Sequence, residues 1–231
     1  NFSPLQELVD SYPTLNGYAI DDPMANYDED APYQNRDPRL KATIIYDGYQ
    51  MTGFDGNQVT INTAPGVAPD GLNYSSNSTP TGYYVHKFYD PMARNQTNSG
   101  LNLILIRYAE VLLNYAEAKI ELGEFNEQDW NTTIRALRER AGLQGAALEF
   151  PGTNQDVLRE IVRNERRIEL AFEAGHRFFD IRRWKIAEDV LEGWTHGIKT
   201  DESTADDGYI RVSLRTFDPS SASDAYNTAL G

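Results

Sequence analysis

Residues 163–184 combine a regular apolar spacing with dense charge of both signs, which limits the folds open to this chain. Apolar residues recur near helical spacing through this stretch and just before it: Val157, Ile161, Ile168 and Phe172. Charges of opposite sign lie three and four positions apart, as on the second face of an amphipathic helix. Gly175 is placed to end this helix, and a new apolar face starts at Phe178. The stretch therefore predicts a pair of helices.

The charges of this helix pair admit two interpretations. Arginines and carboxylates on paired helices usually form partly buried structural networks, and such networks imitate active sites because they also perturb pKa values. We therefore expect a structural network, with no catalytic role for Glu165, Arg177, Asp180 or Arg183. We expect His176 to be a packing residue rather than a ligand or a base.

Two further helices are predicted after residue 101. The first spans 103–122, where one stripe carries Leu105, Ala109, Leu112, Ala116 and Ile120, and Gly123 follows as a stop signal. Asp129 or Asn131 can cap the second, which has Ile134, Leu137 and Ala141 on its inner face and Gly142 at its end. This helix-turn-helix is similar to a tetratricopeptide repeat. The predicted fold is mainly α, with tetratricopeptide-like helix pairs in an α-α superhelix and a loop-rich region containing a few short strands.

Residues 1–100 are rich in Gly, Pro, Asn, Asp and Tyr, a composition typical of loops. Strands are predicted at 42–46 and 59–62, with Asp55-Gly56 turning a hairpin between them, and a short strand at 83–85. Residues 209–214 could form one more strand. We expect a single domain over 1–231, with a loop-rich, ligand-facing region at 1–100, a helical scaffold at 101–195 and an irregular tail at 196–231.

Composition excludes several classes of protein. The chain has 231 residues and no cysteine, which rules out thiolate nucleophiles, zinc–thiolate sites and disulfides. Its net charge of -14 opposes binding to nucleic acid or to anionic lipid, so neutral or cationic ligands fit better. No apolar run reaches the length of about 18 residues that a membrane-spanning helix needs.

The sequence has no recognisable catalytic signature and no pattern that indicates a cofactor. An acidic stretch at residues 21–30 is expected to be a solvated loop, because it lacks the Gly-containing pattern of a calcium loop, and we predict no metal site.

The loop region also carries many aromatic residues: Tyr18, Tyr27, Tyr33, Tyr46, Tyr49, Phe54 and Tyr74. Rings among amides and carboxylates suit sugars, which stack on a flat face and hydrogen-bond through hydroxyls. The expected ligand contacts are in loops 18–33 and 70–80: Tyr18, Asn26, Tyr27, Tyr74 and Asn77.

Four blocks of the sequence form recognisable motifs: Arg36-Asp37-Pro38-Arg39-Leu40, the run from Arg107 to Ala118, the run from Arg135 to Leu143, and Glu173-Ala174-Gly175-His176-Arg177. These blocks resemble the SusD/RagB family of surface nutrient-binding lipoproteins. Together with the opening residues 2–12, they suggest the C-terminal part of a larger protein. The resemblance implies a surface-exposed outer-membrane location, a lipid anchor outside this chain and delivery of ligand to a SusC-like TonB-dependent transporter.

Three functions are compatible with these observations. The first is non-catalytic binding of an oligosaccharide or another nutrient. The second is a glycoside hydrolase, which needs two carboxyl groups spaced about 5–9.5 Å apart across a cleft. The third is a helical-repeat scaffold that binds proteins. We expect the first, with no enzymatic activity.

Overall fold

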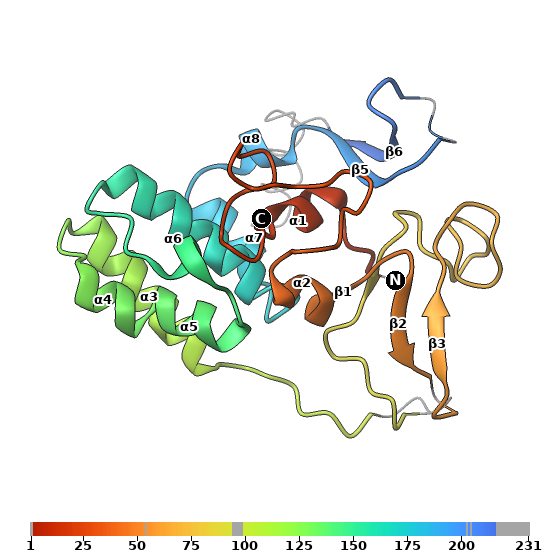
Figure 1. Cartoon of the computed structure of the whole chain (residues 1–231), viewed down its shortest axis with the longest axis horizontal. Helices are drawn as coiled ribbons and strands as arrows, with labels where there is room; N and C mark the ends of the chain where they lie inside the picture. Colours follow the sequence, from red (N-terminus) through yellow and green to blue (C-terminus); the bar gives the residue numbers. More distant parts are fainter. Residues whose placement is uncertain (1, 54, 94–98, 202, 204, 216–231) are drawn as a thin grey trace, which may run out of the picture.

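The structure, a computed structural model, describes residues 2–53, 55–93, 99–201, 203 and 205–215. Helices α3 to α6 lie on one side of the molecule, and loops with short strand pairs lie on the other (Figure 1). The elements before residue 100 are α1 (Gln6–Ser11), α2 (Pro38–Thr43), β1 (Ile44–Ile45), β2 (Tyr49–Thr52), β3 (Gln58–Ile61) and β4 (Tyr84–Val85). The later elements are α3 (Tyr108–Glu121), α4 (Glu127–Thr132), α5 (Ile134–Ala141), the 3₁₀ turn η1 (Gly145–Leu148), α6 (Gln155–Glu169), α7 (His176–Arg183), α8 (Ala187–Leu191), β5 (Gly193–Lys199) and β6 (Tyr209–Arg215). The protein is therefore helix-rich with a few short strands.

Helix α3 starts later than the sequence predicts. It begins at Tyr108 rather than at Leu103, and the preceding Arg107 is extended at φ -134° and ψ 160°. Leu103 and Leu105 are 78% and 73% exposed. A helix gains most of its stability by burying an apolar face, and no described part of the chain covers these two leucines. The helix accordingly starts at Tyr108, one residue before the first buried position, Ala109.

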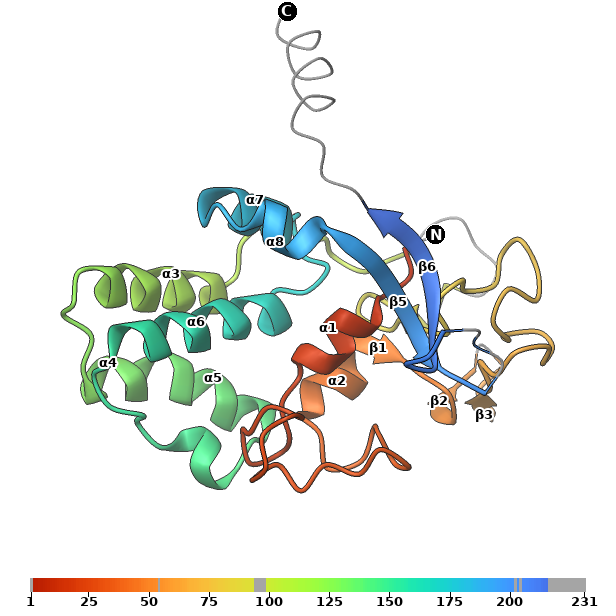
Figure 2. The ribbon, with the colours of Figure 1, turned by 90° about the horizontal axis from the view of Figure 1, so that it is seen from above.

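The buried faces of the two long helices differ in part from the predicted ones. On α3 the buried residues are Ala109, Leu113, Ala116, Glu117 and Ile120. Leu113 was not predicted on this face, and the predicted Leu112 is partly buried against the same core. On α6 the buried residues are Leu158, Val162, Glu165, Arg166, Ile168 and Glu169, whereas Val157 and Phe172 are exposed. The predicted apolar face of α6 is therefore wrong at Val157 and Phe172, and three charged residues, Glu165, Arg166 and Glu169, share the buried face with the apolar ones. Figure 2 shows α3 and α6 running side by side.

Helix α6 ends at Glu169, before Gly175. In the turn that follows, Phe172 and Ala174 take positive φ angles of 62° and 41°. Gly175, at φ 73°, stands immediately before α7 instead of closing α6. The predicted helix pair is confirmed, but the glycine starts the second helix rather than ending the first.

The predicted helix after residue 126 is divided into α4 and α5 by Thr133, whose backbone lies at φ -120° and ψ -91°. Asn126 caps α4, so the predicted caps Asp129 and Asn131 are wrong, although Asp129 completes a capping box with Asn126. Gly142 ends α5 in the left-handed conformation at φ 93°, as predicted. Ile134 is buried on the predicted inner face.

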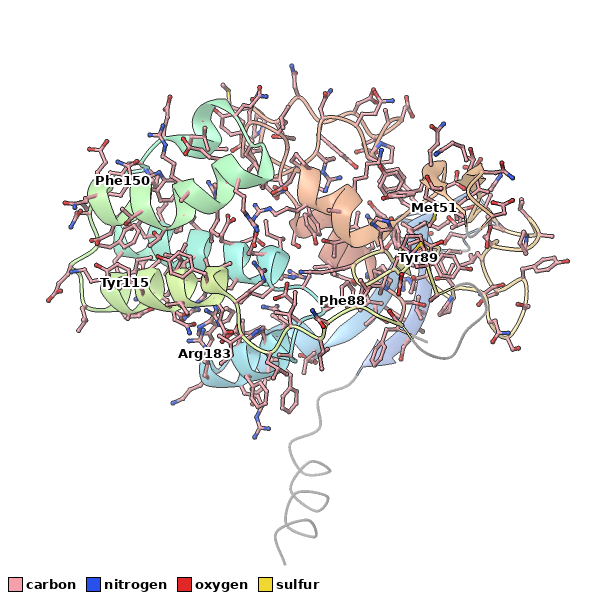
Figure 3. The ribbon with its side chains drawn as sticks, turned by 90° about the horizontal axis from the view of Figure 1, so that it is seen from below. Met51, Phe88, Tyr89, Tyr115, Phe150 and Arg183 are labelled. Atoms are coloured by element: carbon pink, nitrogen blue, oxygen red, sulfur yellow. The ribbon has the colours of Figure 1, made fainter. Side chains whose placement is uncertain are left out.

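The helical core forms around Trp130, which is 1% exposed. The core contains Ala109, Leu113, Ala116, Ile120, Phe125, Trp130, Ile134, Leu137, Leu158, Val162 and Leu170. The indole Nε1 of Trp130 donates to the carbonyl of Leu148 at 3.0 Å. Phe150, labelled in Figure 3, packs against the same indole at a ring-centroid distance of 6.2 Å. This core makes α3 to α6 a rigid support for the loops.

The strand pairing differs from the predicted hairpin. Strand β3 pairs with β2 across a turn that includes Gly53 and Asn57, and not with residues 42–46. Residues 42–46 contain β1, which pairs with β4 through Ile44 to Val85 and Ile45 to Tyr84. The predicted turn at Asp55-Gly56 is confirmed, but the strand before it is β2 and not the predicted strand at 42–46.

The predicted irregular tail begins instead with an antiparallel hairpin of β5 and β6. The strand predicted at 209–214 is confirmed, but β5 was missed. Gly197 lies in the middle of β5, directly against the backbone of Thr81. A Cβ added at this position would lie 2.6 Å from the carbonyl oxygen of Thr81, so only glycine fits there. Ile198 donates its N–H to the carbonyl of Thr81 at 2.8 Å, so a contact remote in sequence fixes β5. Residues 216–231 of the predicted tail lie outside the described residues.

A buried ionic network joins α2 to α6. Arg39, on α2, contacts Asp37 at 2.7 Å, Glu165 at 2.5 Å and Glu169 at 2.8 Å. Arg107 binds Glu169 from the other side at 2.6 Å. The predicted structural network is confirmed, and its partners come from the loop region as well as from the helices.

A second ionic cluster holds α7 against α3. Arg183 contacts Glu117 at 2.5 Å and Asp180 at 2.8 Å, and Arg166 contacts Asp180 at 3.1 Å. Figure 3 shows Arg183 at the edge of α7, below α3. His176 lies near Glu110, with 3.6 Å between Nε2 and Oε2. These contacts are structural, in agreement with the expectation for Asp180 and Arg183.

Candidate functional site

A cavity of about 510 Å³ lies where the loop at 30–34 meets two other loops and the end of β5. We call it the tyrosine cavity. It is lined by Asp30, Ala31, Pro32, Tyr33, Gln34, Tyr46, Asp47, Ala64, Pro65, Ile198, Lys199 and Thr200. Its volume is within the range of about 300–1,000 Å³ that is usual for small-molecule sites.

Two stacked tyrosines form one wall of the tyrosine cavity. The rings of Tyr33 and Tyr46 lie 4.0 Å apart between centroids, at an interplanar angle of 16°. The hydroxyl of Tyr33 is 3.2 Å from that of Tyr83, which donates to Gln6 Oε1 at 2.5 Å. Burial raises the pKa of Tyr33 to about 12, so its hydroxyl is neutral at physiological pH. The pair is a fixed aromatic surface.

Polar groups surround this aromatic surface. Asp30, Gln34 and Asp47 are exposed at the cavity. Asp47 is held in place because its Oδ1 accepts a hydrogen bond from the backbone N–H of Thr63 at 2.8 Å. Lys199 contributes an ammonium group, which lies 3.1 Å from Glu29. The cavity therefore combines two aromatic rings with hydrogen-bond acceptors and one cation.

Arg36 anchors the loop that carries Tyr33. Its guanidinium donates to the carbonyls of Pro32 and Val9 at 2.7 Å and to that of Tyr12 at 2.8 Å. Asp37, beside it, caps α2 by accepting from the N–H of Arg39. Arg36 and Asp37 therefore have structural roles. A buried arginine that satisfies three carbonyls holds an otherwise irregular loop in one conformation.

The five residues expected to contact ligand do not line the tyrosine cavity. Tyr18 and Tyr27 are half-buried, and the guanidinium carbon of Arg36 lies 5.4 Å from the ring centre of Tyr27. Asn26 is exposed at φ 52°, Tyr74 is 53% exposed, and Asn77 is exposed. The loops 18–33 and 70–80 lie apart in both Figure 1 and Figure 2. The role of these residues in binding stays a prediction.

Sequence reasoning named Tyr33 and Tyr46 as loop aromatics without selecting them as contacts. Tyr49, from the same set, is 4% exposed and belongs to the packed interior. Phe54 lies outside the described residues. No signal in the sequence indicates that Tyr33 and Tyr46 stack, because their approach depends on how loop 30–34 lies over the residues that follow β1.

A larger groove of about 1160 Å³ runs between α1, the end of α6, α7, α8 and β5. Many of its walls are apolar, including Phe2, Leu5, Leu170, Phe178 and Trp194. Charged side chains such as Arg167, Glu173 and Glu192 also line the groove, but its wall is more apolar than that of the tyrosine cavity. A ligand hydroxyl buried against apolar wall without a partner is unfavourable. The tyrosine cavity suits a polyhydroxylated ligand better.

The acidic groups with raised pKa values are not in the tyrosine cavity. Burial raises the pKa of Asp10 and that of Asp70, and neither residue lines the cavity. In the acidic stretch, Asp22 and Asp28 accept hydrogen bonds from the N–H groups of Met24 and Asp30. Among the described residues, no group of three or more His, Cys, Asp or Glu side chains could hold a metal ion.

Comparison with known proteins places these features in a family. The sequence model of the SusD family matches residues 1–221. The chain belongs to the SusD family. Within the described residues, no helix of this SusD-family chain has the length and apolar character to cross a membrane.

Two relatives come from Formosa agariphila. SusD-like protein P2 is 41% identical over 101 residues, which are 42% of this chain and 20% of the relative. SusD-like protein P25 is 38% identical over 96 residues, which are 41% of this chain and 18% of the relative. The matched stretch is therefore a small part of both relatives.

Two solved structures from Bacteroides fragilis are similar over nearly the whole chain. A SusD-like carbohydrate binding protein is 30% identical with a TM-score of 0.71, and the match covers 94% of this chain and 44% of that protein. A second SusD-like protein is also 30% identical, with a TM-score of 0.72, and 94% and 42% of the two chains are covered. The fold is therefore that of SusD-like proteins, and this chain spans less than half the length of either structure.

Proposed function

We propose that this SusD-family protein binds saccharides without transforming them, and that the tyrosine cavity is part of the site. The stacked pair of Tyr33 and Tyr46 carries the proposal, because a fixed aromatic surface beside exposed Asp30 and Asp47 matches a sugar ring with its hydroxyls. The Bacteroides fragilis relative, described as a carbohydrate binding protein, supports the ligand class. Loops 18–33 and 70–80 extend the proposed contact surface, with Tyr18, Asn26, Tyr27, Tyr74 and Asn77 as candidates.

A glycan array probed with the whole chain tests the proposal. The expected result is retention of one saccharide class, confirmed by isothermal titration calorimetry. Tyr46→Leu keeps an apolar side chain and removes the ring face, so we expect affinity to fall about 2- to 10-fold, the range of an aromatic stacking contribution. Tyr108→Leu is the matched control, since Tyr108 is 73% exposed on α3, away from the cavity. Loss of affinity in both variants alike, or no retention on the array, would contradict the proposal.

The hydrolase alternative makes a different prediction. Incubation with the retained oligosaccharide should leave it intact if the protein is a binding module. Shorter products would identify a hydrolase with a carboxylate pair instead. The helical-repeat scaffold predicts no affinity for saccharides at all.

We also propose that a TonB-dependent, SusC-like transporter docks on the outer face of α3, in the setting of a lipid-anchored protein on the outer-membrane surface. Exposed apolar residues on this face are spaced by three, four and seven positions: Tyr108, Val111, Tyr115 and Leu122. Exposed apolar stripes of this kind mark interaction surfaces, and they would also suit a further helix of a tetratricopeptide-like superhelix. Val111→Asp should abolish co-purification with the transporter while saccharide affinity stays unchanged, and co-purification at the wild-type level would refute this docking face.

A further inference from the structure

The tyrosine cavity is acidic at the place where a ligand would enter. Asp30 and Asp47 both line it and are both exposed. Within the described part of the chain, Asp47 Oδ2 accepts no hydrogen bond, whereas Oδ1 is held by the N–H of Thr63. A carboxylate that is fixed by one oxygen and open at the other is oriented toward a donor without having to move.

The positive charge at the cavity is already compensated. Of the residues that line the cavity, all of them described, Lys199 alone is a cation. Its ammonium lies 3.1 Å from Glu29 Oε2 and 5.8 Å from the ring centre of Tyr209. The hydrogen bond with Glu29 raises the pKa of Lys199, so the lysine stays charged and paired. Because Glu29 balances the charge of Lys199, the lining carboxylates Asp30 and Asp47 leave a local charge of -2.

We propose that the tyrosine cavity selects saccharides that carry a protonated amine over neutral ones, and rejects saccharides that carry carboxylate or sulfate. This inference rests on the proposed function, because it names the class of saccharide taken by the same site. The aromatic pair makes the site suitable for a sugar ring, and the unbalanced carboxylates determine which substituents on that ring are tolerated.

The expected size of the selection follows from Coulomb's law. One unit charge about 6 Å from another in water changes affinity about threefold, so a local charge of -2 changes it about tenfold. An amino sugar should therefore bind about tenfold more tightly than its neutral counterpart, and a uronic acid about tenfold less tightly. Both differences should shrink strongly at 1 M salt, where the screening length is about 3 Å.

Three tetramers with one β-1,4-linked glucose backbone test this order. They are cellotetraose, its fully deacetylated 2-amino counterpart from chitosan, and its C6-carboxylate counterpart, each titrated into the whole chain by calorimetry at low and high salt. We expect the amino tetramer to bind most tightly and the carboxylate tetramer most weakly. Asp47→Asn should reduce the preference for the amino tetramer about threefold. Glu160→Gln, an equal change of charge on the exposed face of α6, should leave it unchanged.

The outcomes separate this inference from the proposed function. If the carboxylate tetramer binds as tightly as cellotetraose at low salt, or if Asp47→Asn and Glu160→Gln have equal effects, the selection by charge is refuted while saccharide binding stands. If the amino tetramer does not bind while other saccharides are retained on the array, the inference again fails alone. If no saccharide binds by either method, both proposals fail.

Discussion

Removal of the carboxylate of Glu169 should lower the free energy of unfolding at neutral pH, and should lower it less at acidic pH. Glu169 is 4% exposed and receives three arginines: Arg39 at 2.8 Å, Arg107 at 2.6 Å and Arg140 at 2.5 Å. Burial acts to raise the pKa of Glu169, but Arg39 and then Arg107 outweigh it and lower the pKa from 4.5 to about 2. The substitution Glu169→Gln keeps the shape of the side chain and removes its charge.

The sign and size of the effect follow from this shift. Because the folded-state pKa is depressed, the stabilisation by Glu169 is fully present above pH 4.5 and is lost as the pH falls towards 2. A shift from 4.5 to about 2 corresponds to about 3 kcal/mol at pH 7, since each pKa unit is about 1.4 kcal/mol. At pH 3 the same linkage leaves about 1.4 kcal/mol.

Urea unfolding of the wild type and of Glu169→Gln at both pH values measures this effect. We expect the free energies of unfolding to differ by about 3 kcal/mol at pH 7 and by about half of that at pH 3. Glu160→Gln on the exposed face of the same helix is the control, and it should change stability by less than about 0.5 kcal/mol at either pH. A difference between wild type and Glu169→Gln that stays constant from pH 7 to pH 3 would refute the reasoning, because a purely steric role does not titrate.

Four further substitutions test the fold and the loops. Trp130→Ala should lower the free energy of unfolding by about 3–5 kcal/mol in urea titrations, as for other fully buried large side chains, and a loss below 1 kcal/mol would contradict its place in the core. Gly142→Ala should reduce the same quantity by about 1 kcal/mol, because φ is 93° there; unchanged stability would argue against the left-handed cap. Tyr74→Ala should weaken saccharide capture on the array without moving the melting temperature. Tyr27→Ala should also lower the melting temperature slightly, since its ring lies over Arg36, and equal losses of melting temperature for both would show that Tyr74 is also packed.

The candidate site was only partly predictable. The resemblance to SusD/RagB proteins and the aromatic composition of the loops indicated saccharide binding and the part of the chain that would provide it. The stacking of Tyr33 on Tyr46 and the approach of Lys199 could not be predicted, because the lining of the tyrosine cavity comes from residues 30–34, 46–47, 64–65 and 198–200. Contacts between segments so far apart leave no periodic signal in a single sequence.

Local patterns were sufficient wherever a structure depends on neighbouring residues. The sequence alone determined the left-handed end of α5 at Gly142, the pair of helices around residue 175 and the strand at 209–214. Each follows from backbone conformation or from spacing along one element. The SusD-family motifs are likewise properties of contiguous residues.

The tertiary structure decided which faces are buried. Glu165 and Glu169 lie on the buried face of α6 because Arg39 and Arg107, more than fifty residues away in sequence, neutralise them. Without those partners a buried carboxylate is strongly unfavourable, so a pattern that counts only polarity assigns both residues to solvent. The start of α3 and the presence of β5 also depend on the tertiary structure. The first follows from which apolar residues are buried, and the second from the contact with Thr81. Periodicity is a local property, whereas burial of charge is set by the whole fold.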